Sequence, residues 1–177
     1  MTARIVAVVG PSGAGKDTLM DAACAARPDL RRVRRWITRP AEAGGEDFHS
    51  VTEAEFDALA ASGAFALHWR AHGLRYAIPV AQLAGTGTVL LNLSRAVLPD
   101  AARRFPDLTV VLVTAPPAVL AARLAGRGRE SGDDQVRRLA RADFALPDGL
   151  AVRQVLNDGT PALGLVRFLA ALQPERV

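Results

Sequence analysis

Short apolar runs and amphipathic segments alternate along the whole chain. An apolar run of five or six residues between turn residues is typical of a buried strand, whereas apolar positions three or four apart are typical of a helix. Strands are predicted at 4–9, 32–37, 65–69, 74–78, 88–93, 108–114 and 151–156. Helices are predicted at 16–26, 52–61, 79–83, 117–125 and 135–144, with others starting near Pro99 and after Thr160. This alternation predicts an α/β fold in which helices flank a parallel sheet.

Local signals mark several of these boundaries. Thr52 and Glu55 have the spacing of a capping box at the start of a helix. Thr160 suits an N-cap, and Pro161 suits the first helical turn that follows it. A turn at His72-Gly73 would join two of the short strands into a hairpin. The last helix has an apolar stripe on one side, made by Leu165, Phe168, Leu169 and Leu172.

The length and composition indicate one folded domain. The chain has 177 residues, and half of them are hydrophobic, which excludes a wholly disordered protein. The longest apolar stretch is interrupted by Pro116 and Pro117 and falls short of the roughly 18 residues that a membrane span needs, so we expect no membrane contact. Cys24 is the only cysteine, so an intramolecular disulfide is excluded. These features fit a protein of the reducing cytoplasm.

The sequence is modestly basic, with 22 Lys and Arg against 18 Asp and Glu and a net charge of +4. The excess is small and basic residues do not alternate with aromatic ones, so we expect no nucleic-acid partner. Lys16 is the only lysine among the basic residues. A composition that uses arginine everywhere else indicates that position 16 needs an ammonium group, for which a guanidinium is no substitute.

The strongest chemical signal is a glycine-rich segment between the first predicted strand and the first predicted helix. It nearly matches the phosphate-loop pattern of glycine, four residues, glycine and lysine, followed by serine or threonine. Glycines let successive N–H groups face an anion, the helix N-terminus adds positive partial charge, and the lysine would reach the β- and γ-phosphates. The predicted nucleotide-binding residues of this loop are Gly10, Pro11, Ser12, Gly13, Ala14, Gly15, Lys16, Asp17 and Thr18.

Asp17 departs from the pattern, because it stands where serine or threonine normally holds Mg²⁺. A carboxylate is also a hard oxygen ligand, so Asp17 is a candidate to bind Mg²⁺ directly or through water. The alternative is that Asp17 only complements the positive end of the helix dipole. Thr18, one residue further on, could donate its hydroxyl to the α-phosphate. ATP with Mg²⁺ is therefore the expected co-substrate.

Further motifs follow the loop in a definite order. They are Ile37-Thr38-Arg39, Trp69, His72-Gly73-Leu74, Tyr76, Asn92, Ser94-Arg95-Ala96, Arg127-Gly128-Arg129-Glu130, Arg138-Leu139-Ala140-Arg141-Ala142 and Asn157-Asp158-Gly159. With the loop ending Gly-Lys-Asp, this order resembles the guanylate-kinase-type nucleoside monophosphate kinases and, more closely, the ribose 1,5-bisphosphate phosphokinase family. The resemblance covers nearly the whole chain. It implies a single P-loop kinase domain over 1–177, with an acceptor-binding insertion at about 36–84 and a lid at about 126–137.

The resemblance also implies the reaction. ATP would transfer its γ-phosphoryl group to the 1-phosphate of ribose 1,5-bisphosphate, giving 5-phosphoribosyl 1-diphosphate and ADP. Lys16 and two lid arginines would stabilise the transferring charge, and no general base would be needed because the acceptor oxygen is already anionic. The catalytic candidates are Lys16, Arg127 and Arg138. Further nucleotide-binding candidates are Arg123, Arg129, Asn157 and Asp158.

Departures from guanylate kinases argue against a guanine substrate. Arg39 matches the first phosphate-binding arginine of those enzymes, but Glu42 stands where the second is expected. His68 replaces a carboxylate that would read guanine, and Asn92 replaces an acidic residue at the end of a strand. Guanine presents N–H donors that need such an acceptor. The acceptor-binding candidates, which suit a sugar with two phosphates, are Arg39, His72, Arg75, Tyr76, Asn92, Ser94 and Arg95.

Plainer interpretations remain open for these residues and for the chain. Any of the arginines could be a solvated surface residue, and the aromatic residues could simply belong to the core. A guanylate or other nucleoside monophosphate kinase is the nearest alternative function. A catalytically inactive, guanylate-kinase-like binding module is the other, although the intact phosphate loop speaks against it.

Overall fold

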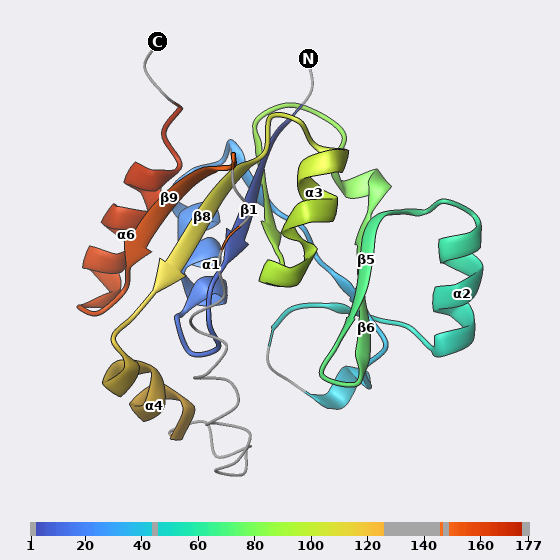
Figure 1. Ribbon diagram of the computed structural model, residues 1–177, viewed down its shortest axis with the longest axis horizontal. Coiled ribbons are helices and arrows are strands. Elements are labelled where there is room, and N and C mark those ends of the chain that lie inside the picture. Colours follow the sequence, from blue (N-terminus) through green and yellow to red (C-terminus); the bar gives the residue numbers. More distant parts are fainter. Residues whose placement is uncertain (1–2, 44–45, 126–145, 147–148, 175–177) are drawn as a thin grey trace.

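The computed structural model describes residues 3–43, 46–125, 146 and 149–174. Five strands form a sheet, here called the core sheet, in the order β2-β7-β1-β8-β9, and all neighbours are parallel (Figure 1). These strands are β1 (Arg4–Val9), β2 (Leu30–Arg32), β7 (Thr88–Asn92), β8 (Thr109–Thr114) and β9 (Ala151–Leu156). A second, small sheet has the order β4-β3-β6-β5. Its strands are β3 (Trp36–Ile37), β4 (His49–Ser50), β5 (Phe65–Ala71) and β6 (Leu74–Pro79).

Helices cover both faces of the core sheet. The α-helices are α1 (Lys16–Ala26), α2 (Glu53–Ala61), α3 (Leu98–Arg104), α4 (Pro117–Ala125) and α6 (Pro161–Ala171). The short 3₁₀ turns are η1 (Ala41–Ala43), η2 (Val80–Gln82) and η3 (Arg95–Val97). Helices α1 and α6 pack on one face of the core sheet, whereas α3 and the β5–β6 hairpin pack on the other (Figure 1). Helix α2 lies against the small sheet, away from the core sheet.

The alternation of side chains along β1 explains this layering. Successive residues of a strand point to opposite faces, so Val6 and Val8 join the cluster under α1 and α6, while Ala7 and Val9 join the cluster under α3. All four side chains are fully buried. A strand buried on both faces reads as a continuous apolar run, which is why the sequence pattern identified β1. The α/β P-loop fold predicted from the sequence is therefore confirmed.

One predicted strand, at 32–37, is wrong as a single element. The chain leaves the core sheet after Arg32 and joins the small sheet only at Trp36. Val33 packs in the cluster beneath α3, whereas Ile37 packs in the core of the small sheet. Val33 and Ile37 pack in two different hydrophobic cores, but in the sequence they look like the apolar positions of a single strand. The predicted loop at 38–50 likewise contains the short strand β4.

Other local predictions are confirmed. The capping box closes, because Thr52 Oγ1 accepts from the Glu55 N–H at 3.2 Å and Glu55 Oε2 accepts from the Thr52 N–H at 2.7 Å. His72 and Gly73 both have positive φ, 53° and 74°, as a primed hairpin turn requires. The helix predicted at 135–144 lies outside the described residues. Within the described residues, no helix combines the length and apolar character needed to cross a membrane.

Candidate active site

The phosphate loop joins β1 to α1 at the carboxyl edge of the core sheet. Gly10 has φ of 148°, and a Cβ there would lie 2.0 Å from the carbonyl oxygen of Val113. Gly15 has φ of 88°, and a Cβ there would lie 2.6 Å from Asn157 Nδ2. Only glycine fits these two positions, because the backbone is left-handed and the neighbours are within contact distance. The loop can therefore present its N–H groups to an anion at the N-terminus of α1.

Lys16 holds its ammonium group inside this loop. Its Nζ donates to the carbonyl oxygens of Gly10 at 2.8 Å and Pro11 at 3.1 Å. Burial lowers the pKa of Lys16 from 10.5 to about 8; the nearby Asp17 carboxylate opposes this shift, and the Arg35 guanidinium adds to it. An incoming phosphate would supply the negative charge that this desolvated ammonium needs. The geometry suits exchange of the two carbonyl oxygens for phosphate oxygens.

Two residues from later parts of the chain bind carbonyl oxygens of the loop. Asn157, buried after β9, donates from Nδ2 to the carbonyl oxygen of Ala14 at 2.8 Å. Arg123 on α4 donates from Nη1 to the carbonyl oxygen of Gly13 at 3.2 Å. The structure thus brings these two predicted nucleotide-binding residues to the loop. Asp158 turns instead to Arg167 on α6 at 2.8 Å, and that hydrogen bond lowers the pKa of Asp158.

Asp17, in the first turn of α1, is held by two partners. Its Oδ1 accepts from Arg32 Nη2 at 2.5 Å and from Asn92 Nδ2 at 2.9 Å. Arg32 also donates to Asp21 at 2.6 Å. Asn92 is the last residue of β7 and is buried, so its amide is committed to Asp17 and its position is fixed. The Asp17 side chain remains 42% exposed next to the phosphate loop.

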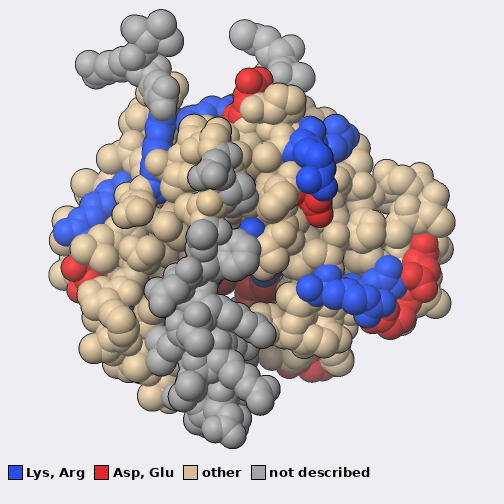
Figure 2. Space-filling view, in the orientation of Figure 1, with Lys and Arg blue, Asp and Glu red and all other residues tan. Residues whose placement is uncertain are grey.

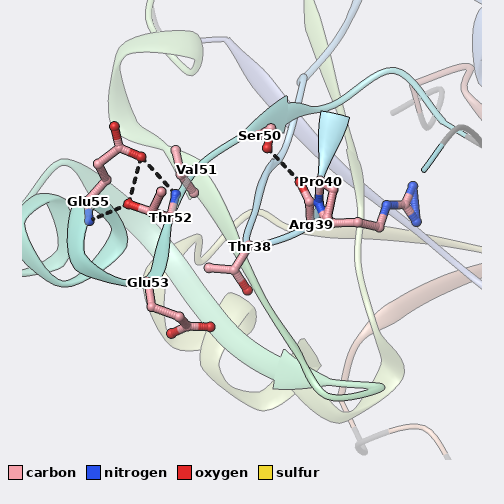
Figure 3. A pocket seen from close by; sticks show the side chains of 8 residues that line it. All are labelled: Thr38, Arg39, Pro40, Ser50, Val51, Thr52, Glu53 and Glu55. Atoms are coloured by element: carbon pink, nitrogen blue, oxygen red, sulfur yellow. Dashed lines mark hydrogen bonds between the residues drawn. The ribbon is translucent and has the colours of Figure 1, made fainter. Parts of the chain in front are cut away.

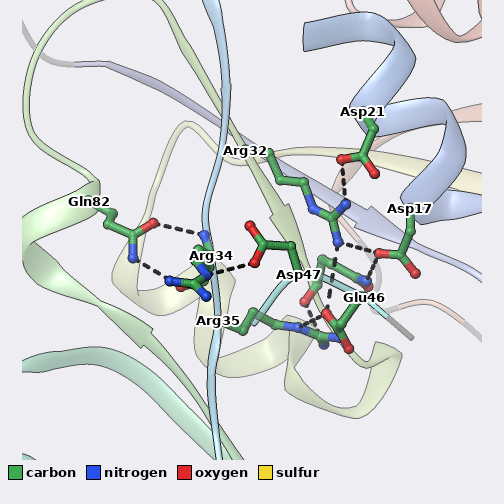
Figure 4. A network of polar contacts seen from close by, with 9 residues as sticks. Asp17, Asp21, Arg32, Arg34, Arg35, Glu46, Asp47 and Gln82 are labelled. Carbon is green, nitrogen blue, oxygen red and sulfur yellow. Dashed lines mark hydrogen bonds and ion pairs between the residues drawn. The ribbon is translucent and has the colours of Figure 1, made fainter. Parts of the chain in front are cut away.

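A buried pair of opposite charge lies beside these residues (Figure 4). Arg35 Nη2 donates to both carboxylate oxygens of Glu46, at 2.5 and 2.6 Å, and Arg35 Nε donates to Glu46 Oε2 at 3.0 Å. Arg35 Nη1 donates to the main-chain oxygen of Asn92 at 3.1 Å. Arg32 is 3.8 Å from Glu46, so the pair and the Asp17 group form one network. The network connects α1, β7 and the segment that leads into β4.

One face of the small sheet carries arginines over aromatic rings. The Arg35 guanidinium lies 5.1 Å from the centre of the Tyr76 ring, and Arg39 lies 4.4 Å from that of Phe48. Tyr76 stacks on Trp69 with ring centres 5.5 Å apart. Stacking of this kind fixes the plane of each guanidinium. The space-filling view of the whole molecule shows a hollow near the centre of the view, with acidic and basic surface inside it (Figure 2).

The remaining acceptor-site candidates are more dispersed. Neighbours in a strand point to opposite faces, so Arg75 points away from the Tyr76 face. Arg75 pairs with Asp57 and Glu53 on α2, and its guanidinium covers the ring of Phe56 at 4.0 Å. The structure therefore does not bring Arg75 to the Tyr76 face. His72 is exposed at the tip of the β5–β6 hairpin.

Ser94 and Arg95 follow the end of β7. Ser94 is the N-cap of η3 through its backbone alone. Arg95 lies close enough to the Lys16 ammonium to lower the pKa of that group, after burial and the effects of Asp17 and Arg35. The structure thus places Arg95 near the phosphate loop, as a residue of the acceptor site would be. Arg127, Arg129 and Arg138 lie outside the described residues, so their predicted roles stay predictions.

A separate hollow opens on the α2 side of the small sheet (Figure 3). Its volume is about 330 Å³, and it is lined by Thr38, Arg39, Pro40, Ser50, Val51, Thr52, Glu53 and Glu55. The side chain of Arg39 points away from the acidic residues of this lining (Figure 3). Two carboxylates make the hollow unsuited to a phosphorylated substrate. We therefore take the Tyr76 face, and not this hollow, as the acceptor side of the site.

The sequence interpretation missed Arg32, Arg35 and Glu46. A signal for the two arginines was present, because the strand predicted at 32–37 contained charged residues that would need partners if it were buried. Glu46 had no such signal, because it lies in a predicted loop. Its partner Arg35 is 11 residues away, and their pairing depends on the path of the chain between the two sheets.

No protein-family model matches the chain. Curated relatives do match it over most of its length. The protein named ribose 1,5-bisphosphate phosphokinase PhnN from Ruegeria sp. (strain TM1040) is 56% identical over 176 residues, which cover 97% of this chain and 93% of that protein. The protein of the same name from Brucella melitensis biotype 2 is 53% identical, over 93% of this chain and 88% of that protein.

Solved structures with low identity share the fold. A guanylate kinase from Anaplasma phagocytophilum superposes with a TM-score of 0.63 at 16% identity, over 97% of this chain and 85% of that one. A gluconokinase from Sinorhizobium meliloti 1021 superposes with a TM-score of 0.55 at 19% identity, over 97% and 91%. At these identities the likeness establishes the kinase fold and leaves the acceptor to be argued from the site.

Proposed function

This chain belongs to the ribose 1,5-bisphosphate phosphokinase family, and we propose that it transfers the γ-phosphoryl group of ATP to the 1-phosphate of ribose 1,5-bisphosphate. The products are 5-phosphoribosyl 1-diphosphate and ADP. The observation that carries the proposal is identity of 56% to a curated relative over almost the full length of both chains. The site geometry supports it, because a phosphate loop faces a group of arginines across the carboxyl edge of the core sheet.

On the nucleotide side, Lys16 and the loop N–H groups bind the β- and γ-phosphates. Lys16 leaves the carbonyl oxygens of Gly10 and Pro11 when the phosphates arrive. Its compact charge then neutralises the bridging oxygen as the γ-phosphoryl group is released. Asn157 and Arg123 hold the loop in place by binding its carbonyl oxygens, so its donors are oriented before the nucleotide binds.

On the acceptor side, Arg39, Tyr76 and Arg95 hold the phosphorylated sugar. The nucleophile is a phosphate oxygen that is anionic at neutral pH, so the reaction needs no general base. The main barrier is the repulsion between the two anions, ATP and the acceptor phosphate. Cations on the nucleotide side and on the acceptor side reduce this repulsion. The reducing cytoplasm, where the free thiol of Cys24 is stable, is the compartment we propose for this reaction.

Asp17 fits a role toward Mg²⁺, which we include in the proposal. Within the described residues, no group of three or more His, Cys, Asp or Glu side chains is placed to hold a metal ion. Mg²⁺ in kinase sites is usually bound by one or two carboxylates together with the substrate phosphates. Asp17 follows Lys16 directly, and Arg32 and Asn92 fix its orientation. When bound, the ion would neutralise phosphate charge.

The test is a comparison of acceptors. Purified protein receives Mg²⁺ and ATP with ribose 1,5-bisphosphate, GMP or AMP, and ADP formation is followed together with mass spectrometry of the product. We expect turnover with ribose 1,5-bisphosphate and a product one phosphoryl group heavier. Turnover with GMP alone would replace the proposal with a guanylate kinase. ATP binding without turnover of any acceptor would favour a binding module.

A further inference from the structure

Glu46 is an unexpected residue in a site for a doubly phosphorylated sugar. Its side chain is only 11% exposed, and it lies beside the cationic face that would hold the substrate. A carboxylate repels phosphate, so its presence there is costly unless it meets hydrogen-bond donors. Arg35 supplies some of those donors through three contacts. The pair is therefore held firmly in one geometry, as bidentate arginine–carboxylate pairs are.

Arg35 is itself fixed on both sheets. It donates to the main-chain oxygen of Asn92 at the end of β7, and its guanidinium lies over the ring of Tyr76 on β6. Its residue exposure is 9%. These contacts hold the guanidinium in one orientation. Because the guanidinium binds both carboxylate oxygens of Glu46, it also fixes the orientation of that carboxylate. Glu46 thus points in a defined direction although it belongs to an irregular segment.

The pair lies at the carboxyl edge of the core sheet. Ligands of open parallel sheets bind at the carboxyl ends of the strands, and Asn92, which Arg35 contacts, is such an end. Both charges also act on the Lys16 ammonium. Arg35 lowers the pKa of Lys16 and Glu46 raises it, both as smaller effects than burial. Glu46 is therefore within electrostatic reach of the place where the γ-phosphoryl group would be transferred.

Glu46 also keeps unused capacity to accept hydrogen bonds. A carboxylate offers about four lone-pair positions. Among the contacts of the described residues, Oε2 accepts from Nε and Nη2 of Arg35, whereas Oε1 accepts only from Nη2. One position on Oε1 is left for a ligand. The group that fills it must be a donor, because a carboxylate paired with arginines offers only acceptor positions.

The chemistry of the acceptor identifies that donor. The polar groups of ribose 1,5-bisphosphate are two phosphates, a ring oxygen and the hydroxyl groups on C2 and C3, and the hydroxyl groups are its donors at neutral pH. The C2 hydroxyl is on the carbon next to C1, so it is the hydroxyl closer to the phosphate that reacts. We propose that Glu46, positioned by Arg35, accepts a hydrogen bond from the C2 hydroxyl and thereby makes the enzyme select ribose over 2-deoxyribose. This inference rests on the proposed function. Carboxylates bind the ribose hydroxyl of dinucleotides in the same way.

The decisive measurement is a ratio of two substrates. We compare kcat/KM for ribose 1,5-bisphosphate with kcat/KM for 2-deoxyribose 1,5-bisphosphate, in the wild-type protein and in Glu46→Gln. The ratio is independent of how much of a variant is folded, since the active fraction cancels. In Glu46→Gln the amide oxygen would stay with Arg35 and the NH₂ would face the sugar, so the acceptor is lost.

We expect the wild-type protein to prefer ribose by at least about 100-fold, since a site built to bind a hydroxyl rejects the analogue that lacks it. Glu46→Gln should reduce that preference by about tenfold or more, with the loss falling on the ribose substrate and the KM for ATP unchanged. The control is Asp47→Asn, because the neighbouring Asp47 pairs with Arg34 on the surface and should leave the ratio as it is.

Arg35→Lys tests whether Arg35 positions Glu46, because lysine keeps the charge but cannot make the bidentate contact with the Glu46 carboxylate. We expect a smaller fall in the same ratio. An equal loss on both substrates in Glu46→Gln, or a wild-type protein without preference, would overturn the inference and leave the proposed function intact. A wild-type protein that phosphorylates neither sugar would overturn the proposed function, and the inference with it.

Discussion

The nucleotide side and the acceptor side of this protein are built in different ways. The core sheet consists of parallel strands whose inner residues, such as Val6 and Leu90, are fully buried between helices. The small sheet includes two strands of only two residues, and both residues of β4 are exposed. Ion pairs such as Arg35–Glu46 supply contacts there that apolar burial supplies in the core sheet. The first side is held by packing, whereas the second combines two smaller apolar clusters with specific polar contacts.

Both sides use contacts between residues far apart in the sequence, since Asn157 binds the phosphate loop across 143 residues, but the central cation of each side differs in how far away its own partners lie. Lys16 binds carbonyl oxygens five and six residues before it. On the acceptor side, Arg35 binds Asn92 across 57 residues. A short segment can therefore define a phosphate loop, whereas the acceptor site exists only once the whole fold is in place. This difference explains how one kinase fold can keep its nucleotide chemistry and change its acceptor.

The largest effect should come from replacing lysine by arginine on the nucleotide side and arginine by lysine on the acceptor side. In Lys16→Arg, the wider guanidinium cannot enter the space bounded by the carbonyl oxygens of Gly10 and Pro11, so we expect kcat to fall by about 10³-fold or more. In Arg39→Lys, the charge is kept but the planar, stacked group is lost, so the KM for the acceptor should rise by about tenfold with a small change in kcat. Steady-state kinetics with both substrates varied will measure this.

Each variant serves as the control for the other. Thermal unfolding should show that both proteins fold, because neither side chain belongs to an apolar core cluster. If Lys16→Arg raised only the KM for the acceptor, or if Arg39→Lys weakened ATP binding, the division into two sides would be wrong. Near-normal turnover in Lys16→Arg would also refute the assignment of the phosphate loop.

A smaller effect should appear in the pH dependence of nucleotide binding. The free protein holds the pKa of Lys16 at about 8, chiefly through burial, whereas bound phosphates require the charged form. As pH rises through 8, the free protein loses the proton that binding needs, so affinity for ADP should fall. We expect the dissociation constant to rise about tenfold between about pH 7 and pH 9. Calorimetric titration across this range will measure it.

The matched variants for the pH experiment are Lys16→Met and Arg39→Ala. Lys16→Met should bind ADP weakly and with little dependence on pH, because the titrating group is gone. Arg39→Ala should keep the wild-type pH profile, since we propose that Arg39 binds the acceptor and not the nucleotide. A profile that is unchanged in Lys16→Met would show that another group controls nucleotide binding.

The predictability of the fold follows the same division. Strands β1, β7, β8 and β9 were predicted within one residue at each end. Burial on both faces leaves a continuous apolar run in β1, β7 and β8, whereas β9 is mostly exposed or half-buried and was found from its shorter apolar pattern. The residues from Arg32 to Ile37 were misread, because their apolar positions serve two different cores. The spacing of apolar residues indicates which residues are buried, but it does not indicate which layer of the fold they pack against.

From the residues alone, the candidate site was predictable only where its parts are adjacent in sequence, whereas distant partners of the loop such as Arg123 and Asn157 were named through the family resemblance. The loop from Gly10 to Lys16 could be found by pattern, since the backbone geometry demands glycine at fixed positions. Arg75 was named for the acceptor site as a cation suited to a sugar with two phosphates, and in the structure it pairs with α2 on the face opposite Tyr76, because neighbours in a strand face opposite sides. Glu46 was not considered, because nothing near it indicates that Arg35 lies beside it in the fold. A contact between residues of different sheets can be predicted only when the path of the chain in three dimensions is known.

The smallest effect should come from the two helix caps, one on each side. Thr52 Oγ1 accepts from the Glu55 N–H at 3.2 Å at the start of α2, and Thr160 Oγ1 accepts from the Leu163 N–H at 3.3 Å at the start of α6. Replacement of either threonine by alanine should cost about 1 kcal/mol of helix stability. The cap chemistry is the same, so any difference between the variants reflects the surroundings of each helix.

Helix α6 contributes Phe168 to the main core, so Thr160→Ala should lower the free energy of global unfolding by about that amount. Helix α2 contributes Phe56 to the small sheet alone, so Thr52→Ala should speed hydrogen exchange in α2 while global unfolding changes less. Urea unfolding and amide exchange will separate the two. Equal losses of global stability would mean that both sides unfold as one cooperative unit, and the acceptor side would then owe its stability to the core sheet through contacts such as Arg35 to Asn92.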